Sequence, residues 1–168
     1  IDGTYDYING KDEFTLNAAL IINNKTSIGV VYAPAKDRMF YTYGQNSSFE
    51  INNGNKNELK CKKISKINEV KAVSYSNDLK TEILEIHKKY KVTNFTKMKS
   101  SLKFCVVATG EYDLYVAEPR ACEWDIAAGH AILIGAGGEV TDFNGNEILY
   151  GKKDFKNPSL ILKRSSKL

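Results

Sequence analysis

The sequence has no long apolar run: none of its 168 residues belongs to a stretch approaching the roughly 18 to 20 apolar residues of a membrane-spanning helix. The first residues also lack the basic and then apolar order of a secretory signal peptide. We therefore expect a cytoplasmic protein with no membrane span.

Cysteine and histidine are scarce as well. The three cysteines, Cys61, Cys105 and Cys122, are odd in number, have no CxxC spacing and have no histidine nearby. This argues against a disulfide framework and against a zinc site. The thiols are expected to be reduced, and Cys105 to pack as a small apolar residue.

Basic residues exceed acidic ones only slightly, which gives a net charge of +4. Several lysines gather in one segment: Lys56, Lys60, Lys62, Lys63 and Lys66. A basic cluster is typical of nucleic-acid binding, because neutralising phosphates supplies affinity that is independent of sequence. Here Asn and Glu rather than aromatic residues separate the lysines, and Lys and Asn are frequent along the whole chain. Compositional bias explains the cluster better, so we expect no nucleic-acid partner.

What is present is the composition of a globular domain with one core, because 42% of the residues are hydrophobic and 26% are charged. Between Phe14 and Ile51, apolar and β-branched runs alternate with short Asn, Ser and Gly connections, which is typical of antiparallel hairpins. We predict a meander of three or four strands there, with residues 1–55 completing a first, N-terminal sheet. The polar segment 52–68 is the predicted boundary, and residues 56–168 form a C-terminal α/β subdomain.

In the second half the apolar period alternates between that of strands and that of helices, which is typical of an α/β layer. The predicted strands cover residues 70–74, 91–95, 113–117, 139–142 and 159–162. The predicted helices begin at Asp78, after the Ser100–Ser101 pair and at Asp125, and Gly110 ends the second of them. The fold class is therefore α/β, in the form of an α+β layered sandwich.

The first residues form one of three short stretches that carry oxygen ligands or free N–H groups. Ile1-Asp2-Gly3-Thr4 precedes a short helical segment, so the N–H groups of Gly3 and Thr4 can face an anion. Asp2 can hold a cation that bridges to this anion, because hard divalent cations prefer oxygen ligands. Taken alone, an Asp-Gly-Thr tripeptide is more often a turn.

The other two stretches lie at predicted helix starts. Asp125 places a carboxylate at the positive end of a helix, either as a metal ligand or as an ordinary cap. Ser100 and Ser101 offer hydroxyl and N–H groups that suit a phosphate or a ribose hydroxyl, or simply a cap. His130, farther along the same helix as Asp125, is expected to pack in the core rather than act as a base.

Together these stretches resemble the inositol monophosphatase superfamily, whose two-part signature is IDGT followed by WDxAAGH. Both parts are present, at residues 1–4 and 124–130. FTLNAALI, IGVVYAP, AGGEVTD and a late NPSLI are similar to further stretches of the family, so the resemblance covers nearly the whole chain. SSLKFCVVATGEYDLY and EWDIAAGHAIL resemble its bisphosphate nucleotidase branch, also called CysQ-type, and SSLKFC is the most discriminating run.

The resemblance implies a Mg²⁺ site in which the first stretch has catalytic roles. Asp2 matches a metal-binding aspartate, and Ile1 would offer its main-chain carbonyl as a further ligand. Thr4 matches the threonine that orients the nucleophilic water, and the N–H groups of Gly3 and Thr4 match phosphate contacts. Asp125 matches the metal-binding aspartate of the second signature and also faces the substrate.

For the substrate, the resemblance implies contacts from Ser100 and Ser101, with Glu118 or Glu123 near the sugar. Two departures from the family pattern bear on these contacts. Lys99 stands where relatives carry glycine just before the paired serines, which alters the turn or adds a charge near the substrate. EPRAC stands where nucleotidases carry a GPT stretch, which leaves the substrate contacts there open.

The family motif begins two residues before Ile1, so the resemblance implies a fold that is incomplete at its N-terminus. In relatives the preceding part supplies a metal-binding glutamate, another aspartate, two helices and further strands. We expect this N-terminal half to act in cis or in trans. Without it, the strands between residues 14 and 51 should expose apolar side chains on one face.

The resemblance implies a Mg²⁺-dependent phosphomonoester hydrolase. The leading expectation is a 3'(2'),5'-bisphosphate nucleotidase that converts adenosine 3',5'-bisphosphate to AMP and phosphate, in sulfur metabolism. A phosphorylated inositol or another sugar phosphate is the alternative small-molecule substrate. A hypothesis from a different class is an inactive truncated remnant that serves as a scaffold.

Overall fold

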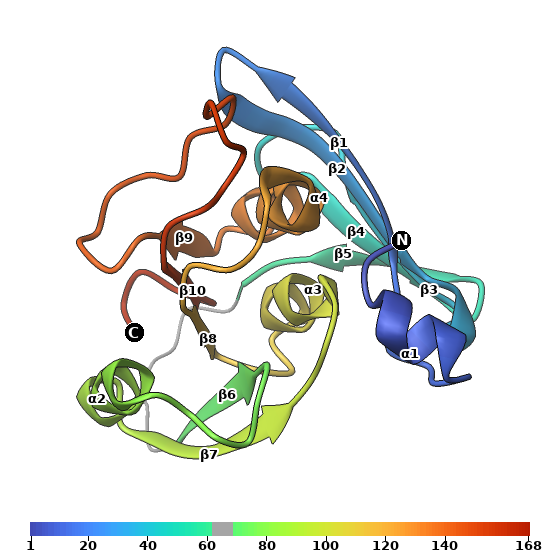
Figure 1. Cartoon of the computed structure of the whole chain (residues 1–168). Coiled ribbons are helices and arrows are strands. Elements are labelled where there is room, and N and C mark those ends of the chain that lie inside the picture. Colours follow the sequence, from blue (N-terminus) through green and yellow to red (C-terminus); the bar gives the residue numbers. More distant parts are fainter. Residues whose placement is uncertain (62–68) are drawn as a thin grey trace.

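A computed structural model describes residues 1–61 and 69–168 of the chain. Two five-stranded sheets lie on either side of a layer of two helices, and a third helix covers the outer side of the second sheet (Figure 1). This is the α+β layered sandwich that the sequence predicts. Lys62, Lys63 and Lys66 of the predicted lysine cluster lie outside the described residues, as does part of the predicted boundary segment.

The first sheet is an antiparallel meander in the order β1-β2-β3-β4-β5. Its strands are β1 (Leu16–Ile22), β2 (Lys25–Ala33), β3 (Arg38–Thr42), β4 (Ser48–Asn52) and β5 (Asn55–Leu59). The four strands β1 to β4 confirm the prediction of three or four strands between residues 14 and 51, but the sheet continues into a fifth strand that was not predicted. The additional strand, β5, lies in a polar segment whose side chains are mostly exposed, so it lacks the apolar alternation by which the other strands were found.

The turn between β4 and β5 has the geometry of a two-residue hairpin loop. Asn53 and Gly54 have φ angles of 47° and 78°, both in the left-handed region that an Asn-Gly pair adopts readily. Asn52 pairs with Asn55 across this loop. The first sheet thus runs to Leu59, past the boundary predicted at residue 55, and the division into two subdomains stays a prediction.

The second sheet has the order β7-β6-β8-β10-β9 and mixes parallel with antiparallel pairs. Its strands are β6 (Val70–Ser74), β7 (Val92–Lys97), β8 (Leu114–Ala117), β9 (Glu139–Thr141) and β10 (Leu160–Lys163). β6 is parallel to β7 and β8, whereas β10 is antiparallel to β8 and β9. All five strands overlap the predicted ones.

The helices are α1 (Thr4–Ile8), α2 (Thr81–Lys89), α3 (Leu102–Thr109) and α4 (Glu123–Gly135), with a 3-10 turn at Pro34–Lys36. The predicted start of α2 at Asp78 is wrong. The Asp78 N–H donates to Ser76 Oγ (3.0 Å) in a turn that precedes the helix. α3 ends at Gly110, as predicted, where a φ of 80° turns the chain out of the helix.

Helix α4 packs directly on β2 and is buried on nearly all sides. The close approach requires glycine at position 29, because a Cβ there would lie 2.3 Å from the Ala128 carbonyl oxygen. Ile132 of α4 and Cys105 of neighbouring α3 have no exposed surface. His130 is only 5% exposed, so it packs in the core as predicted.

Strand β1 is an edge of the first sheet and none of its residues is buried. Leu16, Leu20 and Ile22 are 44%, 46% and 50% exposed, and Ile28 of β2 is 37% exposed. These side chains match the expectation that the first strands expose an apolar surface.

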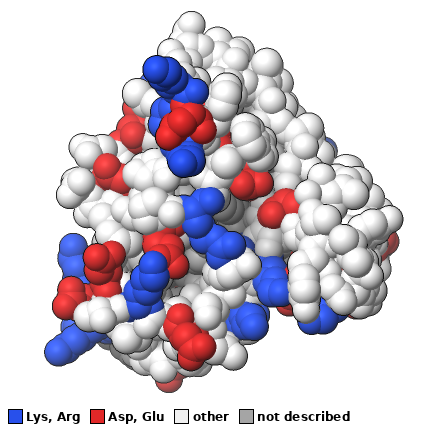
Figure 2. Space-filling model, viewed as in Figure 1, with Lys and Arg blue, Asp and Glu red and all other residues white. Residues whose placement is uncertain are grey.

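The molecular surface shows no single sign of charge on the face drawn in Figure 2, where acidic and basic side chains are intermixed. Such a face lacks the continuous basic stripe that is typical of nucleic-acid binding. None of the helices in the described parts of the chain has the length and apolar character needed to cross a membrane.

Candidate active site

A cavity of about 120 Å³ opens where the chain start, α3, β8 and the start of α4 meet. The residues predicted from sequence that line this cavity are Asp2, Ser100, Ser101, Glu118 and Asp125. Tyr75, Lys103, Tyr115 and Arg120 line it as well, although the sequence suggested no role for them. The fold therefore brings together side chains that are up to 123 positions apart, since Asp2 and Asp125 lie on the same cavity.

Asp2 is held in place by its main chain. Its N–H donates to the Thr15 carbonyl and its own carbonyl accepts from the Thr15 N–H, both at 2.9 Å. The next residue, Gly3, has a φ of 84°, and a Cβ there would lie 2.6 Å from the Glu13 carbonyl oxygen. Only glycine fits this left-handed turn without strain, so Gly3 sets the direction in which the chain leaves Asp2.

Asp125 is both a helix cap and part of the cavity. The Cys122 N–H donates to Asp125 Oδ2 at 2.8 Å across the first turn of α4, so the interpretation as a cap is confirmed. The other oxygen, Oδ1, accepts no hydrogen bond from the described residues. One carboxylate can therefore fix the helix start and still offer an oxygen to a ligand.

The negative charge of Asp125 affects the ionisation of Asp2. Burial raises the pKa of Asp2; the Lys103 ammonium lowers it, and the negative charge of Asp125 raises it again. The net result is a raised pKa for Asp2. Two carboxylates on one cavity disfavour each other's charge, and a bound cation would relieve this repulsion.

The two serines at the start of α3 have different surroundings. The buried Ser101 hydroxyl donates to Asn17 Oδ1 (2.7 Å) and lies 2.8 Å from the Thr15 hydroxyl. Ser100 has a φ of 57°, and its Oγ accepts only a long bond of 3.4 Å from the Leu102 N–H. Ser101 is therefore engaged by the first sheet, whereas the Ser100 hydroxyl is more available to a ligand.

Lys99 points away from the cavity. Its ammonium lies 3.3 Å from Asp6 Oδ1 and 4.6 Å from the centre of the Tyr5 ring, both in α1. Its main-chain N–H donates to Glu13 Oε2 at 3.0 Å. The departure from glycine at this position thus adds a link to α1 and not a charge on the cavity.

Lys103 is the main cavity residue that the sequence analysis missed. It is buried, its Nζ donates to the Ser100 carbonyl at 2.5 Å, and it lies 5.3 Å from the centre of the Tyr115 ring and 5.6 Å from that of Tyr75. Burial is the main cause that lowers the pKa of Lys103, to about 8. The available signal was a lysine within the otherwise apolar helix LKFCVVAT, since lysine is seldom buried without a reason.

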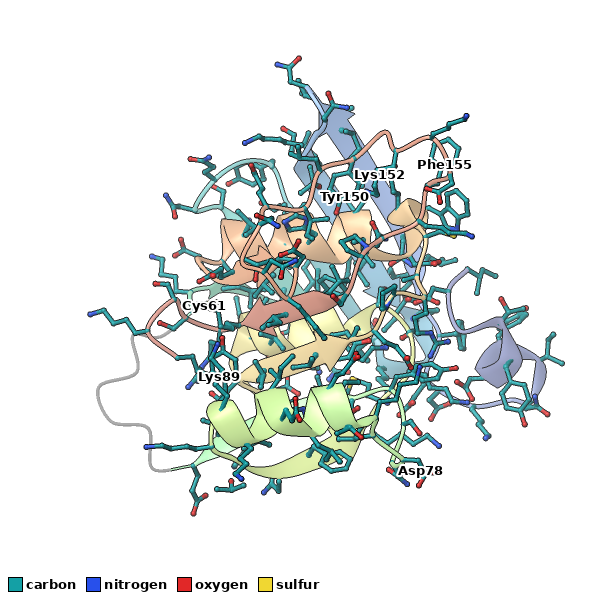
Figure 3. The ribbon with its side chains drawn as sticks, turned by 60° about the vertical axis from the view of Figure 1, so that its left-hand side comes forward. Cys61, Asp78, Lys89, Tyr150, Lys152 and Phe155 are labelled. Carbon is teal, nitrogen blue, oxygen red and sulfur yellow. The ribbon has the colours of Figure 1, made fainter. Side chains whose placement is uncertain are left out.

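The two glutamates predicted near the sugar lie in different places. Glu118 lines the cavity and forms an ion pair with Lys80. Glu123 does not line it: its carboxylate accepts from the N–H groups of Gly151 (2.9 Å) and Lys152 (3.0 Å) and pairs with the Lys152 ammonium at 2.6 Å. These bonds hold the loop that carries Tyr150 and Lys152 beside α4 (Figure 3).

Ile1, Gly3 and Thr4 are next to the cavity in sequence but do not line it. Ile1 is 64% exposed, and Thr4 is an exposed residue at the first position of α1. In residues 1–61 and 69–168, no group of three or more His, Cys, Asp or Glu side chains is arranged to hold a metal ion. The described cavity is lined by three carboxylates: those of Asp2 and Asp125, and that of Glu118, which is paired with Lys80.

Comparison with known proteins gives the family. Residues 1–167 match the family model described as "Inositol monophosphatase family". The chain belongs to this family. The resemblance that the two signature stretches suggested is therefore confirmed, and the family members to which the chain is similar include bisphosphate nucleotidases.

The 3'(2'),5'-bisphosphate nucleotidase CysQ of Salmonella typhimurium is 35% identical over 159 residues, which are 94% of this chain and 63% of that protein. The corresponding protein of Escherichia coli is 33% identical, with the same coverage. Among solved structures, CysQ from Bacteroides thetaiotaomicron superposes with a TM-score of 0.80 at 29% identity, covering 96% of this chain and 66% of that one. This chain thus spans less than two thirds of the length of these relatives.

Proposed function

We propose that this chain is part of a Mg²⁺-dependent phosphomonoester hydrolase, a 3'(2'),5'-bisphosphate nucleotidase that converts adenosine 3',5'-bisphosphate to AMP and phosphate. The observation that carries the proposal is one cavity that combines two carboxylates, Asp2 and Asp125, with a buried lysine, Lys103. The carboxylates suit cations that hold the phosphate to be removed. The lysine suits a second anionic group, which a bisphosphate has and a monophosphate lacks.

The residues present fit Mg²⁺ in part. Asp2 and Asp125 offer hard oxygen ligands. Burial and the charge of Asp125 raise the pKa of Asp2, and a bound cation would lower that pKa again by stabilising the carboxylate. Ile1 would add its main-chain carbonyl. When bound, Mg²⁺ polarises the phosphate and lowers the pKa of a bound water.

The other residues would bind and orient the substrate. Lys103 places a compact positive charge inside the cavity, where its low exposure strengthens attraction to a phosphate oxygen. The Ser100 hydroxyl and the Glu118 carboxylate line the same space and suit sugar hydroxyls. The Thr4 hydroxyl remains the proposed contact to the attacking water, and the N–H groups of Gly3 and Thr4 remain the proposed contacts to the phosphate, although none of them lines the cavity in this structure.

Further carboxylates are part of the proposal, because two are few for Mg²⁺, which requires near-octahedral oxygen coordination. The curated relatives are longer than this chain, which covers 63% of the Salmonella protein. We propose that an N-terminal segment, in cis or as a separate chain, completes the site. A cytoplasmic location and a place in sulfur metabolism belong to the same proposal.

The rival functions are hydrolysis of inositol or another sugar phosphate, and an inactive remnant that serves as a scaffold. Phosphate release by the complete form with Mg²⁺ separates all three. We expect adenosine 3',5'-bisphosphate to be hydrolysed with a kcat/KM about tenfold or more above that of inositol 1-phosphate, which corresponds to roughly 1.4 kcal/mol in transition-state binding. The reverse preference would support the sugar phosphatase, and no release from either compound would support the scaffold.

Lys103→Met tests the role of the lysine within this assay. The variant keeps the length of the side chain and removes its charge, so it should lower kcat/KM for the bisphosphate by about tenfold or more while inositol 1-phosphate changes little. An equal loss for both substrates would instead indicate a general effect on the fold of the cavity.

A further inference from the structure

Arg120 and Tyr75 form a stacked pair on the wall of the cavity. Arg120 lies in the loop between β8 and α4, and Tyr75 directly follows β6. The guanidinium carbon lies 3.4 Å from the centre of the Tyr75 ring, which is van der Waals contact between the cation and the ring face. Both residues line the cavity, so the pair faces the same space as Lys103.

The charge of Arg120 is not neutralised by a carboxylate. Among residues 1–61 and 69–168, its guanidinium takes part in no ion pair and no hydrogen bond. The acidic residue of the same loop, Glu118, is paired with Lys80. Stacking occupies a face of the guanidinium and leaves the N–H groups in its plane free to bind an anion.

Arg120 also acts on the buried lysine. Burial lowers the pKa of Lys103, Asp2 raises it, and the positive charge of Arg120 lowers it further. Two cations that repel each other across a cavity favour a group with negative charge between them. Asp2 also acts on Lys103, whereas the charge of Arg120 has no carboxylate partner among the described residues.

We propose that Arg120, held by stacking on Tyr75, is a specificity residue that binds the phosphate retained in the product of a bisphosphate substrate. This inference rests on the proposed function for the identity of the substrate. The EPRAC run differs from the GPT stretch of nucleotidases, which left the substrate contacts of this loop open. The inference assigns one of these contacts to Arg120. It also gives Tyr75 a positioning role, because the ring fixes the plane of the guanidinium.

Binding of adenosine 5'-monophosphate and of adenosine to the full chain, measured by isothermal titration calorimetry in EDTA, tests the inference without turnover or metal. The wild-type protein should bind the nucleotide about tenfold or more tightly than the nucleoside. Arg120→Met should remove most of this difference by weakening nucleotide binding alone, with adenosine affinity kept within about twofold.

Two further variants separate recognition from a structural role. Tyr75→Phe keeps the ring and should bind the nucleotide like wild type, whereas Tyr75→Leu should lose affinity for the nucleotide and not for adenosine. Lys56→Met is the matched control, because Lys56 also lies over an aromatic ring, 4.3 Å from the centre of Phe49, but on the first sheet. This control should leave both affinities unchanged.

The inference is overturned if wild type does not distinguish the nucleotide from the nucleoside, or if Arg120→Met changes neither affinity or both equally. A failure of the proposed function has a different signature. In that case no phosphate is released from adenosine 3',5'-bisphosphate in the complete form, while the calorimetric difference between wild type and Arg120→Met is still measured.

Discussion

The hydroxyl oxygens of Ser101 and Thr15 lie 2.8 Å apart in the interior, where Ser101 is 2% and Thr15 0% exposed. Because the Ser101 hydroxyl donates to Asn17, Thr15 must donate to Ser101. This chain of bonds ties the start of α3 to the beginning of the first sheet. It also fixes Asp2, since Asp2 exchanges two main-chain hydrogen bonds with the same Thr15.

Ser101→Ala should therefore destabilise the fold. It leaves buried Thr15 and Asn17 groups without their partner, at a cost of about 1–3 kcal/mol in the free energy of unfolding. Ser100→Ala is the matched control and should cost much less, because the Ser100 hydroxyl accepts only a bond of 3.4 Å. Urea denaturation of both variants checks the difference. Equal stabilities would show that the Ser101 network contributes little.

Asp125→Asn should keep the fold and weaken Mg²⁺ binding. The amide oxygen can still accept the Cys122 N–H and cap α4, but a neutral amide is a poorer ligand for a hard cation. In the complete form we expect most phosphate release to be lost at limiting Mg²⁺, with partial recovery at high Mg²⁺. The thermal midpoint should change little. Wild-type activity at limiting Mg²⁺ would exclude Asp125 as a metal ligand.

His130 should make the protein less stable in mild acid. Its Nδ1 lies 2.8 Å from the buried Tyr150 hydroxyl, and burial lowers the pKa of His130 to about 4, whereas an unfolded histidine titrates at about 6.5. Between these two pKa values, His130 is protonated in the unfolded chain but not in the folded one. The stability that neutral, buried His130 contributes is therefore complete above pH 6.5 and is lost as the pH falls toward 4. The loss is about 1.4 kcal/mol per pH unit at most.

His130→Gln checks this pH dependence, because glutamine can hydrogen-bond to Tyr150 and does not titrate. The free energy of unfolding of wild type should fall more steeply than that of the variant between pH 6.5 and 4, and the two slopes should agree above pH 7. Parallel curves throughout would mean that other groups, such as buried carboxylates, cause the acid sensitivity.

Adding an N-terminal segment of the kind present in relatives should raise both solubility and phosphate release. It would supply further carboxylates to the Asp2 and Asp125 site and would cover Leu20 and Ile22 of β1, which are 46% and 50% exposed. Light scattering and a phosphate assay, with the segment in cis or in trans, provide the measurements. If the 168-residue chain alone is monomeric and turns over at about 1 to 10³ s⁻¹, the segment is unnecessary.

Much of the fold could be predicted because its strands and helices carry local signals. The second-sheet strands are short apolar runs between turn residues, and Gly110 ends α3 through its left-handed conformation. β5 was missed because most of its side chains are exposed, so its sequence does not alternate between apolar and polar residues as a half-buried strand does. Asn53 and Gly54 did signal the hairpin, but a polar segment without a strand pattern was taken for a boundary.

The sequence by itself determined the family, because IDGT and WDIAAGH are local motifs that can be read without the fold. The same motifs marked Asp2 and Asp125 as candidate ligands of a cation. Only the tertiary structure decided which candidates share a cavity. Glu118 lines it, whereas Glu123, only five positions later, turns to the Gly151–Lys152 loop. Lys103 and Arg120 became candidates only in the folded chain. Lys103 is buried and lines the cavity with Asp2, whereas exposed Arg120 stacks on Tyr75 at the cavity wall, and both arrangements depend on contacts between residues far apart in the chain.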